Sequence, residues 1–256
     1  SPMIQIRILL LLVVLCSSSK FHAQRVIHIV VALCDNQYQG IVKVPAGIGN
    51  GQDARTNLYW GAGYGVKTHF NRSAEWTAQP SSPATNSHIL ERAVWKHRDS
   101  AVYIIADAYD GRYIKEATQA LFSYASGAEK SEFVVNGVKI NIGGGADMIA
   151  YVGHDGLMEF SLDRTFTAKD TKQRETIILA CISKRYFAPY LEPTGAKPLV
   201  WTTGLMAPEA YTLKAALIGW VAHESDADIR ERAAKAYDQY QKCGINGARR
   251  LLVTGW

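Results

Sequence analysis

The sequence has little of what marks several large classes of protein. Only 4 of its 256 residues are cysteine and 8 are proline, so neither a disulfide-built scaffold nor a proline-rich, disordered or collagen-like chain is expected. The formal net charge is only +5 and is spread along the chain, which gives no reason to expect nucleic acid as a partner. Hydrophobic residues make up 48% of the chain, enough for a packed core at this length.

No apolar run is long enough for a membrane-spanning helix, which takes about 20 residues. The run at residues 8–16 follows Arg7 and precedes a polar stretch, and this order is typical of a secretory signal peptide. We predict a signal peptide over residues 1–23 with cleavage after Ala23. The protein would then be exported to the periplasm or secreted, with no stable insertion in the membrane afterwards.

The first residues support two further interpretations. Ser1 and Pro2 precede Met3 and are interpreted as a remnant of cloning. Cys16 is followed by three serines, so a lipid anchor on this cysteine is the less favoured alternative to simple export.

Alternating apolar and amphipathic segments predict the fold. The runs that are short, nearly continuously apolar and rich in β-branched residues cover 26–33, 101–106, 148–152, 176–180 and 198–202. Such runs are typical of strands covered on both faces, as in a parallel sheet. Helical spacing predicts helices over 57–70, 111–125, 208–222 and 226–243. We therefore expect an α/β protein, a three-layer α/β/α sandwich with a mostly parallel sheet, as a single domain over 24–256.

Two segments between these elements are less regular. Asn136-Gly137 is a strong two-residue turn signal, so residues 133–140 are predicted to form a short hairpin. Residues 71–100 show no clear period and are expected to form a long loop with one short helix over 89–95.

A histidine and a cysteine follow two consecutive predicted strands. His154 lies in a glycine-flanked turn after the run 148–152, and Cys181 follows the run 176–180. In open α/β sheets functional groups lie beyond the carboxyl ends of the strands, so we expect the two side chains to lie close together. A thiol nucleophile needs a neighbouring imidazole, because the thiolate is the attacking species. The amides of Gly156 and Cys181 could bind the oxyanion of a tetrahedral intermediate.

These motifs resemble those of the caspase-like cysteine peptidases, which include caspases, legumain, clostripain and gingipains. In that family a His-Gly motif ends one strand of a caspase-like sheet and an Ala-Cys motif ends the next. The resemblance implies His154 as general acid and base, Cys181 as nucleophile, and an oxyanion hole at the amides of Cys181 and Gly156. It implies an endopeptidase that acts on polypeptides through a thioester, with no cofactor and no metal in the site.

The same resemblance suggests where a substrate binds. The family often recognises the side chain before the scissile bond from the loop after the first strand, which here carries Asp53 and Arg55. Arg55 would suit an acidic residue and Asp53 a basic one, and the sequence does not choose between them. Asp155 interrupts the His-Gly pair and would bring an acidic group close to the dyad. Trp201 ends the last strand and could form a pocket wall.

Three alternatives remain open. A catalytically silent relative could keep the fold and use the rim of the sheet to bind a peptide or glycan. The glycine-rich loop at 45–53 could instead cradle a phosphate of a nucleotide or phosphosugar, although it lacks a Gly-Lys-Ser/Thr ending. Cys34 also ends a predicted strand and is the rival nucleophile, although no His-Gly motif precedes it.

Overall fold

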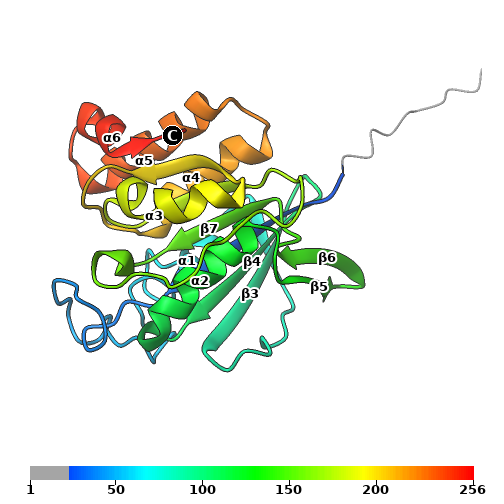
Figure 1. The fold of residues 1–256 in the computed structure, drawn as a ribbon, viewed down its shortest axis with the longest axis horizontal. Helices are drawn as coiled ribbons and strands as arrows, with labels where there is room; N and C mark the ends of the chain where they lie inside the picture. The colour runs from blue at the N-terminus through cyan, green and yellow to red at the C-terminus, as the bar shows by residue number, and fades with distance from the viewer. Residues whose placement is uncertain (1–22) are drawn as a thin grey trace, which may run out of the picture.

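The computed structural model describes residues 23–256, which form a central sheet with helices on both faces (Figure 1). The predicted three-layer α/β/α sandwich with a mostly parallel sheet is confirmed. The predicted signal peptide, apart from Ala23, and Cys16 lie outside the described residues. Within residues 23–256, no helix is both long enough and apolar enough to cross a membrane.

Strands and helices alternate along much of the chain. The strands are β1 (Arg25–Ala32), β2 (Trp76–Gln79), β3 (Ile89–His97), β4 (Val102–Tyr109), β5 (Lys130–Val135), β6 (Val138–Gly143), β7 (Met148–Val152), β8 (Glu175–Leu179), β9 (Lys197–Thr202) and β10 (Leu252–Val253). The α-helices are α1 (Val66–Asn71), α2 (Ile114–Ala125), α3 (Ser183–Leu191), α4 (Ala210–Val221), α5 (Asp226–Gln241) and α6 (Ile245–Leu251). Short 3-10 turns are η1 (Gly111–Tyr113), η2 (Gly156–Met158) and η3 (Glu192–Thr194).

The large sheet has the strand order β10-β9-β8-β7-β1-β4-β3-β2. Its centre is parallel, because β1 pairs in parallel with both β4 and β7, and β7, β8 and β9 continue in the same sense. Antiparallel strands close both edges, with β3 and β2 on one side and β10 on the other. The strands β5 and β6 form a separate two-stranded ribbon that projects from the body of the molecule (Figure 1).

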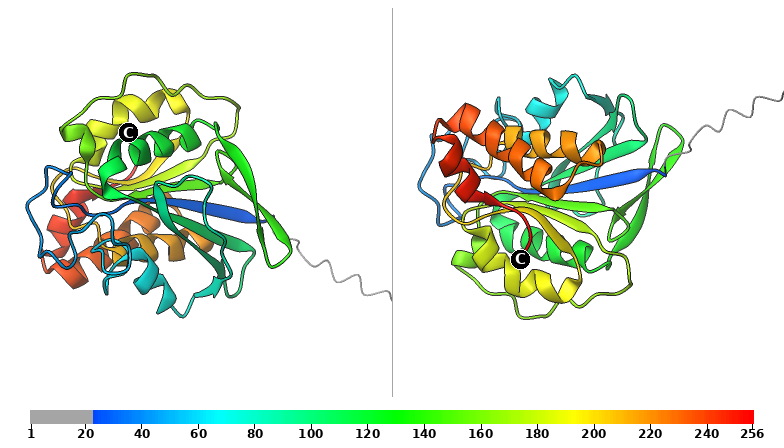
Figure 2. Two further views of the ribbon diagram at one scale, coloured as in Figure 1. Left: turned by 90° about the horizontal axis from the view of Figure 1, so that it is seen from below. Right: turned by 90° about the horizontal axis from the view of Figure 1, so that it is seen from above.

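Strand β1 shows why the central runs are continuously apolar. Ile27, Ile29 and Val31 join the core beneath α1, α4 and α5. Val30 and Ala32 point the other way, into the core beneath α2 and α3. Successive side chains of a strand alternate between its faces, so a strand with helices on both sides (Figure 2) must be apolar at nearly every position.

The prediction for residues 71–100 was wrong. Residues 89–95, expected as a helix, belong to the strand β3, which pairs antiparallel with β4, and β2 extends the sheet beyond it. Trp95 lies opposite Ile104 of β4 and is buried. The segment shows no clear period of its own, and pairing with an adjacent strand decides its structure, because strand preference depends mainly on the neighbours against which the side chains pack.

The predicted helix over 57–70 forms only in its last part, as α1. The buried side chain of Asn57 caps no helix, because its amide bridges backbone groups of Cys34 and Asn50. A Cβ at Gly61 would lie 1.9 Å from the carbonyl oxygen of Arg55, so this glycine permits a close approach of two backbone segments that a helix would not make. The segment therefore turns repeatedly before α1 begins.

The remaining local predictions agree better with the structure. The predicted hairpin forms as β5 and β6, and Asn136 and Gly137 both have positive φ, 45° and 77°, as a type I′ turn requires. The predicted helices over 111–125, 208–222 and 226–243 correspond to slightly shorter helices α2, α4 and α5. Helices α3 and α6 were not predicted.

Candidate active site

The two predicted catalytic residues leave the sheet at matched positions of neighbouring strands. Strands β7 and β8 are adjacent and parallel, and Val152 is the register partner of Leu179. His154 and Cys181 each lie two residues beyond this pair. The amide of Gly153 still donates to the carbonyl oxygen of Leu179 at 3.2 Å, so the two chains stay paired up to the residue before the histidine. The backbone positions of His154 and Cys181 therefore lie at the same edge of the sheet, at the ends of two neighbouring parallel strands.

His154 is held in one orientation by a carboxylate. Its Nε2 lies 2.6 Å from Oε1 of Glu159, and only 10% of its side chain is exposed. The hydroxyl of the buried Tyr151 donates to the carbonyl oxygen of His154 at 2.8 Å, which anchors the backbone beneath the ring. A hydrogen bond at one ring nitrogen sets the role of the other, so Nδ1 is the nitrogen left for proton transfer.

Glu159 was missed by the sequence analysis. It follows η2, five residues after the histidine, and nothing in its local sequence separates it from an ordinary surface glutamate. A Cβ at Gly40 would lie 2.2 Å from Oε1 of Glu159. The loop after β1 therefore packs directly against the carboxylate that orients His154, and a side chain at position 40 would require that carboxylate to shift.

Cys181 lies in the sharp turn between β8 and α3 and is partly exposed. Its Sγ accepts a hydrogen bond from the Met206 amide at 3.4 Å and donates to the Met206 carbonyl oxygen at 3.5 Å. The next residue, Ile182, has φ 50° and ψ 36°, a left-handed conformation that is rare for a β-branched residue. Its amide donates to the carbonyl oxygen of Gly204 at 2.8 Å, which helps to hold this strained turn.

The buried hydroxyl groups of Ser183 and Thr202 stabilise the same turn. The Thr202 amide donates to Oγ of Ser183 at 2.9 Å, and the Ser183 amide donates to Oγ1 of Thr202 at 3.1 Å. The Ser183 hydroxyl also donates to the carbonyl oxygen of Ile178 at 2.9 Å, and the Thr202 hydroxyl donates to that of Ala180. Because both side chains are fully buried, this network fixes the backbone on which Cys181 is carried.

Within residues 23–256, no hydrogen bond joins the His154 ring to the Cys181 thiol, since Nε2 is bound to Glu159 and Sγ to Met206. Catalytic hydrogen bonds are often long or absent before substrate binds. Among the same residues, the amides of Gly156 and Cys181 donate to no protein acceptor. An N–H group that donates to no protein acceptor is the kind of donor that an oxyanion hole requires.

Asp155 does not lie where a substrate-binding residue is expected. Its side chain is fully buried, and Oδ1 accepts the Leu157 amide at 3.0 Å, which caps η2. Oδ2 has no partner among the described residues. Burial, together with the negative charge of Glu159, raises the pKa of Asp155 to about 7. Asp155 therefore shapes the turn between His154 and Gly156 from inside, and the prediction that it binds substrate is withdrawn.

Trp201 is also inside the protein. Its ring is fully buried, its Nε1 donates to the carbonyl oxygen of Gly255 at 3.0 Å, and the ring packs edge-on against Trp256. It presents no surface for a pocket wall. The residue after β9 that approaches the candidate nucleophile is Met206, through its backbone.

Asp53 and Arg55 both lie on the loop after β1 and pair with each other. Arg55 Nη2 is 3.5 Å from Oδ2 of Asp53, and the Thr56 hydroxyl donates to the same oxygen at 3.2 Å. The Arg55 side chain is largely exposed. Among the described residues, neither side chain is hydrogen-bonded to His154 or Cys181, so the choice between an acidic and a basic substrate residue stays open.

The glycine-rich loop is packed around carboxylates. A Cβ at Gly51 would lie 2.2 Å from Oδ2 of Asp35, and Nε2 of Gln52 donates to both Asp35 and Asp110, at 2.8 and 2.7 Å. These negative charges disfavour a phosphate at this loop. Gly49 and Gly51 allow this loop to pack closely against Asn36 and Asp35 at the end of β1.

Cys34, the rival nucleophile, is fully buried at the end of β1. Burial raises the pKa of its thiol to about 11, which keeps it protonated and unreactive near neutral pH. Cys181 is therefore the better candidate of these two thiols.

No family model, curated protein or solved structure matches this chain. Function must therefore be inferred from its own residues and their geometry.

Proposed function

We propose that this protein is a caspase-like cysteine endopeptidase in which Cys181 is the nucleophile and His154 the general base. The observation that carries the proposal is the matched placement of the two residues beyond β7 and β8, with His154 oriented by Glu159. A cysteine and a carboxylate-bound histidine at neighbouring strand ends are the residue types that nucleophilic catalysis by cysteine uses on several unrelated folds.

The chemistry follows from these groups. Nδ1 of His154 takes the thiol proton, and the Cys181 thiolate attacks the carbonyl carbon of the scissile amide. The amides of Gly156 and Cys181 then stabilise the oxyanion. His154 returns the proton to the leaving amine, which departs as the thioester forms. Water, deprotonated by the same imidazole, hydrolyses the thioester and regenerates the thiol. Glu159 stabilises the imidazolium between these steps.

Apolar side chains beside the site favour a polypeptide as the substrate. Leu205 and Met158 are among the exposed large hydrophobic residues. Leu205 precedes Met206, whose backbone contacts the thiol, and Met158 precedes Glu159. Exposed apolar residues at a candidate site are typical of surfaces that bind partners or substrates. Export of the mature chain is part of the same proposal and depends on the leader sequence alone.

The test is the rate of iodoacetamide labelling of Cys181 as a function of pH, resolved by peptide mass spectrometry. The exposed Cys243 serves as the internal control within each sample. We expect Cys181 to react about tenfold or more faster than Cys243 below neutral pH. The excess should disappear in His154→Ala and fall several-fold in Glu159→Gln. Equal labelling of both thiols in all three proteins would contradict the dyad.

Peptide cleavage then separates an enzyme from a silent relative. A fluorogenic peptide library should be hydrolysed by the wild type, and Cys181→Ala should abolish the activity. Fast, His154-dependent labelling without cleavage of any peptide would favour the catalytically silent binding protein.

A further inference from the structure

A chain of buried polar groups links the strands β1, β4 and β3 of the sheet. The carboxylate of Asp107 on β4 is fully buried and accepts two bonds from Arg92 on β3, Nε at 2.6 Å and Nη2 at 2.8 Å. His28 on β1 reaches the same carboxylate through Nε2 at 2.8 Å, while its Nδ1 accepts the Gly143 amide at 2.9 Å. The His28 proton therefore lies on Nε2, and Arg92 alone balances the charge of Asp107.

Burying an ion pair carries a desolvation cost that the attraction between the two charges can fail to repay. Only 11% of the Arg92 side chain is exposed, and it faces a cavity of about 620 Å³. This volume is within the usual range for small-molecule sites. The cavity lies between the loop before β3, the helix α2 and the ribbon β5–β6. Neither His154 nor Cys181 lines it.

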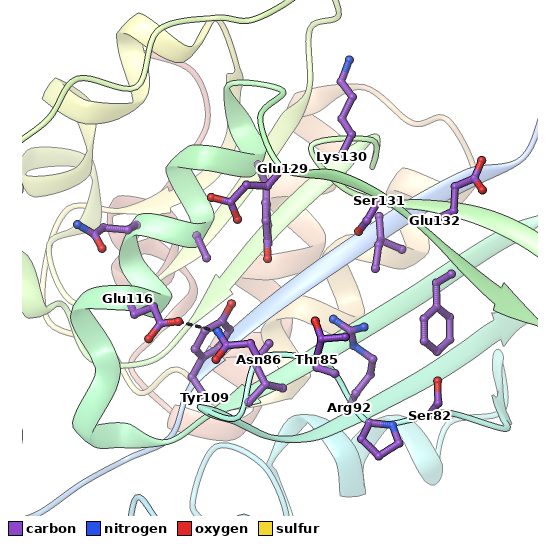
Figure 3. Close-up of a pocket in the computed structure, with 18 of the residues that line it drawn as sticks. Ser82, Thr85, Asn86, Arg92, Tyr109, Glu116, Glu129, Lys130, Ser131 and Glu132 are labelled. Carbon is purple, nitrogen blue, oxygen red and sulfur yellow. Dashed lines mark hydrogen bonds between the residues drawn. The ribbon is translucent and has the colours of Figure 1, made fainter.

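Opposite charges face each other across this cavity. In Figure 3, Arg92 rises from the sheet between Thr85 and Ser131, while Glu116 and Glu129 extend from α2 and the loop after it. Within residues 23–256, Nη1 of Arg92 has no hydrogen-bond acceptor, and Oε2 of Glu129 receives no hydrogen bond. A cationic donor and an anionic acceptor are thus both left open toward one space.

The two carboxylates are held in place by the protein. Glu129 accepts the Ser123 hydroxyl at 2.9 Å, and Glu116 accepts the amide of Asn86 at 2.6 Å and also pairs with His88. Hydrogen bonds from neighbouring residues hold such carboxylates in a fixed position before a ligand binds. The lining holds three cationic side chains and three carboxylates, those of Arg92, Lys130, Arg164, Glu116, Glu129 and Glu132, so a ligand of one charge meets groups of the same sign as well as the opposite one. The arrangement suits a molecule that carries both charges.

We infer that this cavity binds a small zwitterion, an α-amino acid or short peptide with both termini free. Its carboxylate would accept from Nη1 of Arg92, and its ammonium would donate to Glu129 and Glu116, as charge-assisted hydrogen bonds. This site is separate from the proposed dyad and does not depend on the peptidase activity.

The test is isothermal titration of the protein with the twenty common L-amino acids and then with a library of uncapped tripeptides. We expect saturable binding of at least one probe at millimolar concentration or below. N-acetylation or C-amidation of that probe should each weaken binding about tenfold or more, since each removes one charge-assisted contact.

Variants locate the binding in the cavity. Glu129→Gln is an exposed, shape-conserving change and should weaken the same probe about tenfold. Arg92→Lys should also weaken binding of this probe, because an ammonium group lacks the planar set of donors with which a guanidinium can bind Asp107 and a ligand carboxylate together. The matched control is Glu192→Gln, an exposed glutamate that does not line the cavity, and this change should leave the affinity unchanged. Absence of binding, equal binding of capped and free probes, or equal losses in Glu129→Gln and Glu192→Gln would each overturn the inference.

Discussion

Replacing Asp155 by asparagine tests whether a buried, half-satisfied carboxyl lies beneath the candidate active site. Burial raises the pKa of this group from its ordinary 3.8 to about 7. The folded chain therefore keeps the proton over a pH range in which the unfolded chain has already lost it. The contribution of Asp155 to stability is fully present below about pH 4 and is lost as the pH rises to about 7.

The size of the effect follows from the difference between the two pKa values. A difference of about 3 pH units at about 1.4 kcal/mol each sets an upper limit of about 4 kcal/mol. Water entry and loop relaxation lower this limit, so we expect a change of about 2 to 4 kcal/mol. Asparagine is neutral at every pH and keeps the oxygen that accepts the Leu157 amide. Asp155→Asn should therefore be more stable than the wild type near pH 8 and nearly equal to it near pH 4.

Urea denaturation followed by tryptophan fluorescence measures this difference at several pH values. Asp163→Asn is the matched control, because the Asp163 side chain is almost fully exposed and lies 3.9 Å from Lys115, so its replacement should change stability little at any pH. If Asp155→Asn is instead less stable than the wild type near pH 8, the carboxylate is charged and bound by a partner, and the reasoning is wrong.

Two further substitutions test the loops that support the site. Asn57→Ala removes four hydrogen bonds of one buried amide and should lower the free energy of unfolding by about 2 to 4 kcal/mol. Urea denaturation measures this loss. A loss below about 1 kcal/mol would show that the loop keeps its structure without the Asn57 side chain. Gly40→Ala places a methyl group against Glu159 and should slow Cys181 labelling as much as Glu159→Gln does. Gly47→Ala, where a Cβ meets no atom within 4 Å, should change nothing, and an equal effect of both changes would refute the role given to Gly40.

Much of the sheet could be predicted from local sequence because its central strands are buried on both faces. The runs that became β1, β7, β8 and β9 are apolar at almost every position, and burial between two layers of helices demands this. The turn at Asn136-Gly137 was also predictable, since both residues adopt the positive φ that a type I′ turn needs. The placement of His154 and Cys181 followed from the rule that parallel strands end at one edge.

Other features depend on contacts that local sequence does not encode. Strand β3 forms because its residues pair with β4, whereas its own sequence shows no clear period. The local sequence around Glu159 does not distinguish it from a surface glutamate. Its role is visible only in the folded structure, where the loop at Gly40 packs against it.

The sequence by itself determined the alternation of strands and helices and the two strand ends that carry His154 and Cys181, because hydrophobic periodicity and turn chemistry are local properties. Only the tertiary structure decided that β7 and β8 are neighbours in register, that Asp155 and Trp201 are buried, and that Glu159 meets the histidine. These features depend on contacts between residues that are far apart in the sequence and meet only when the chain folds. They also depend on the exclusion of water from the packed interior.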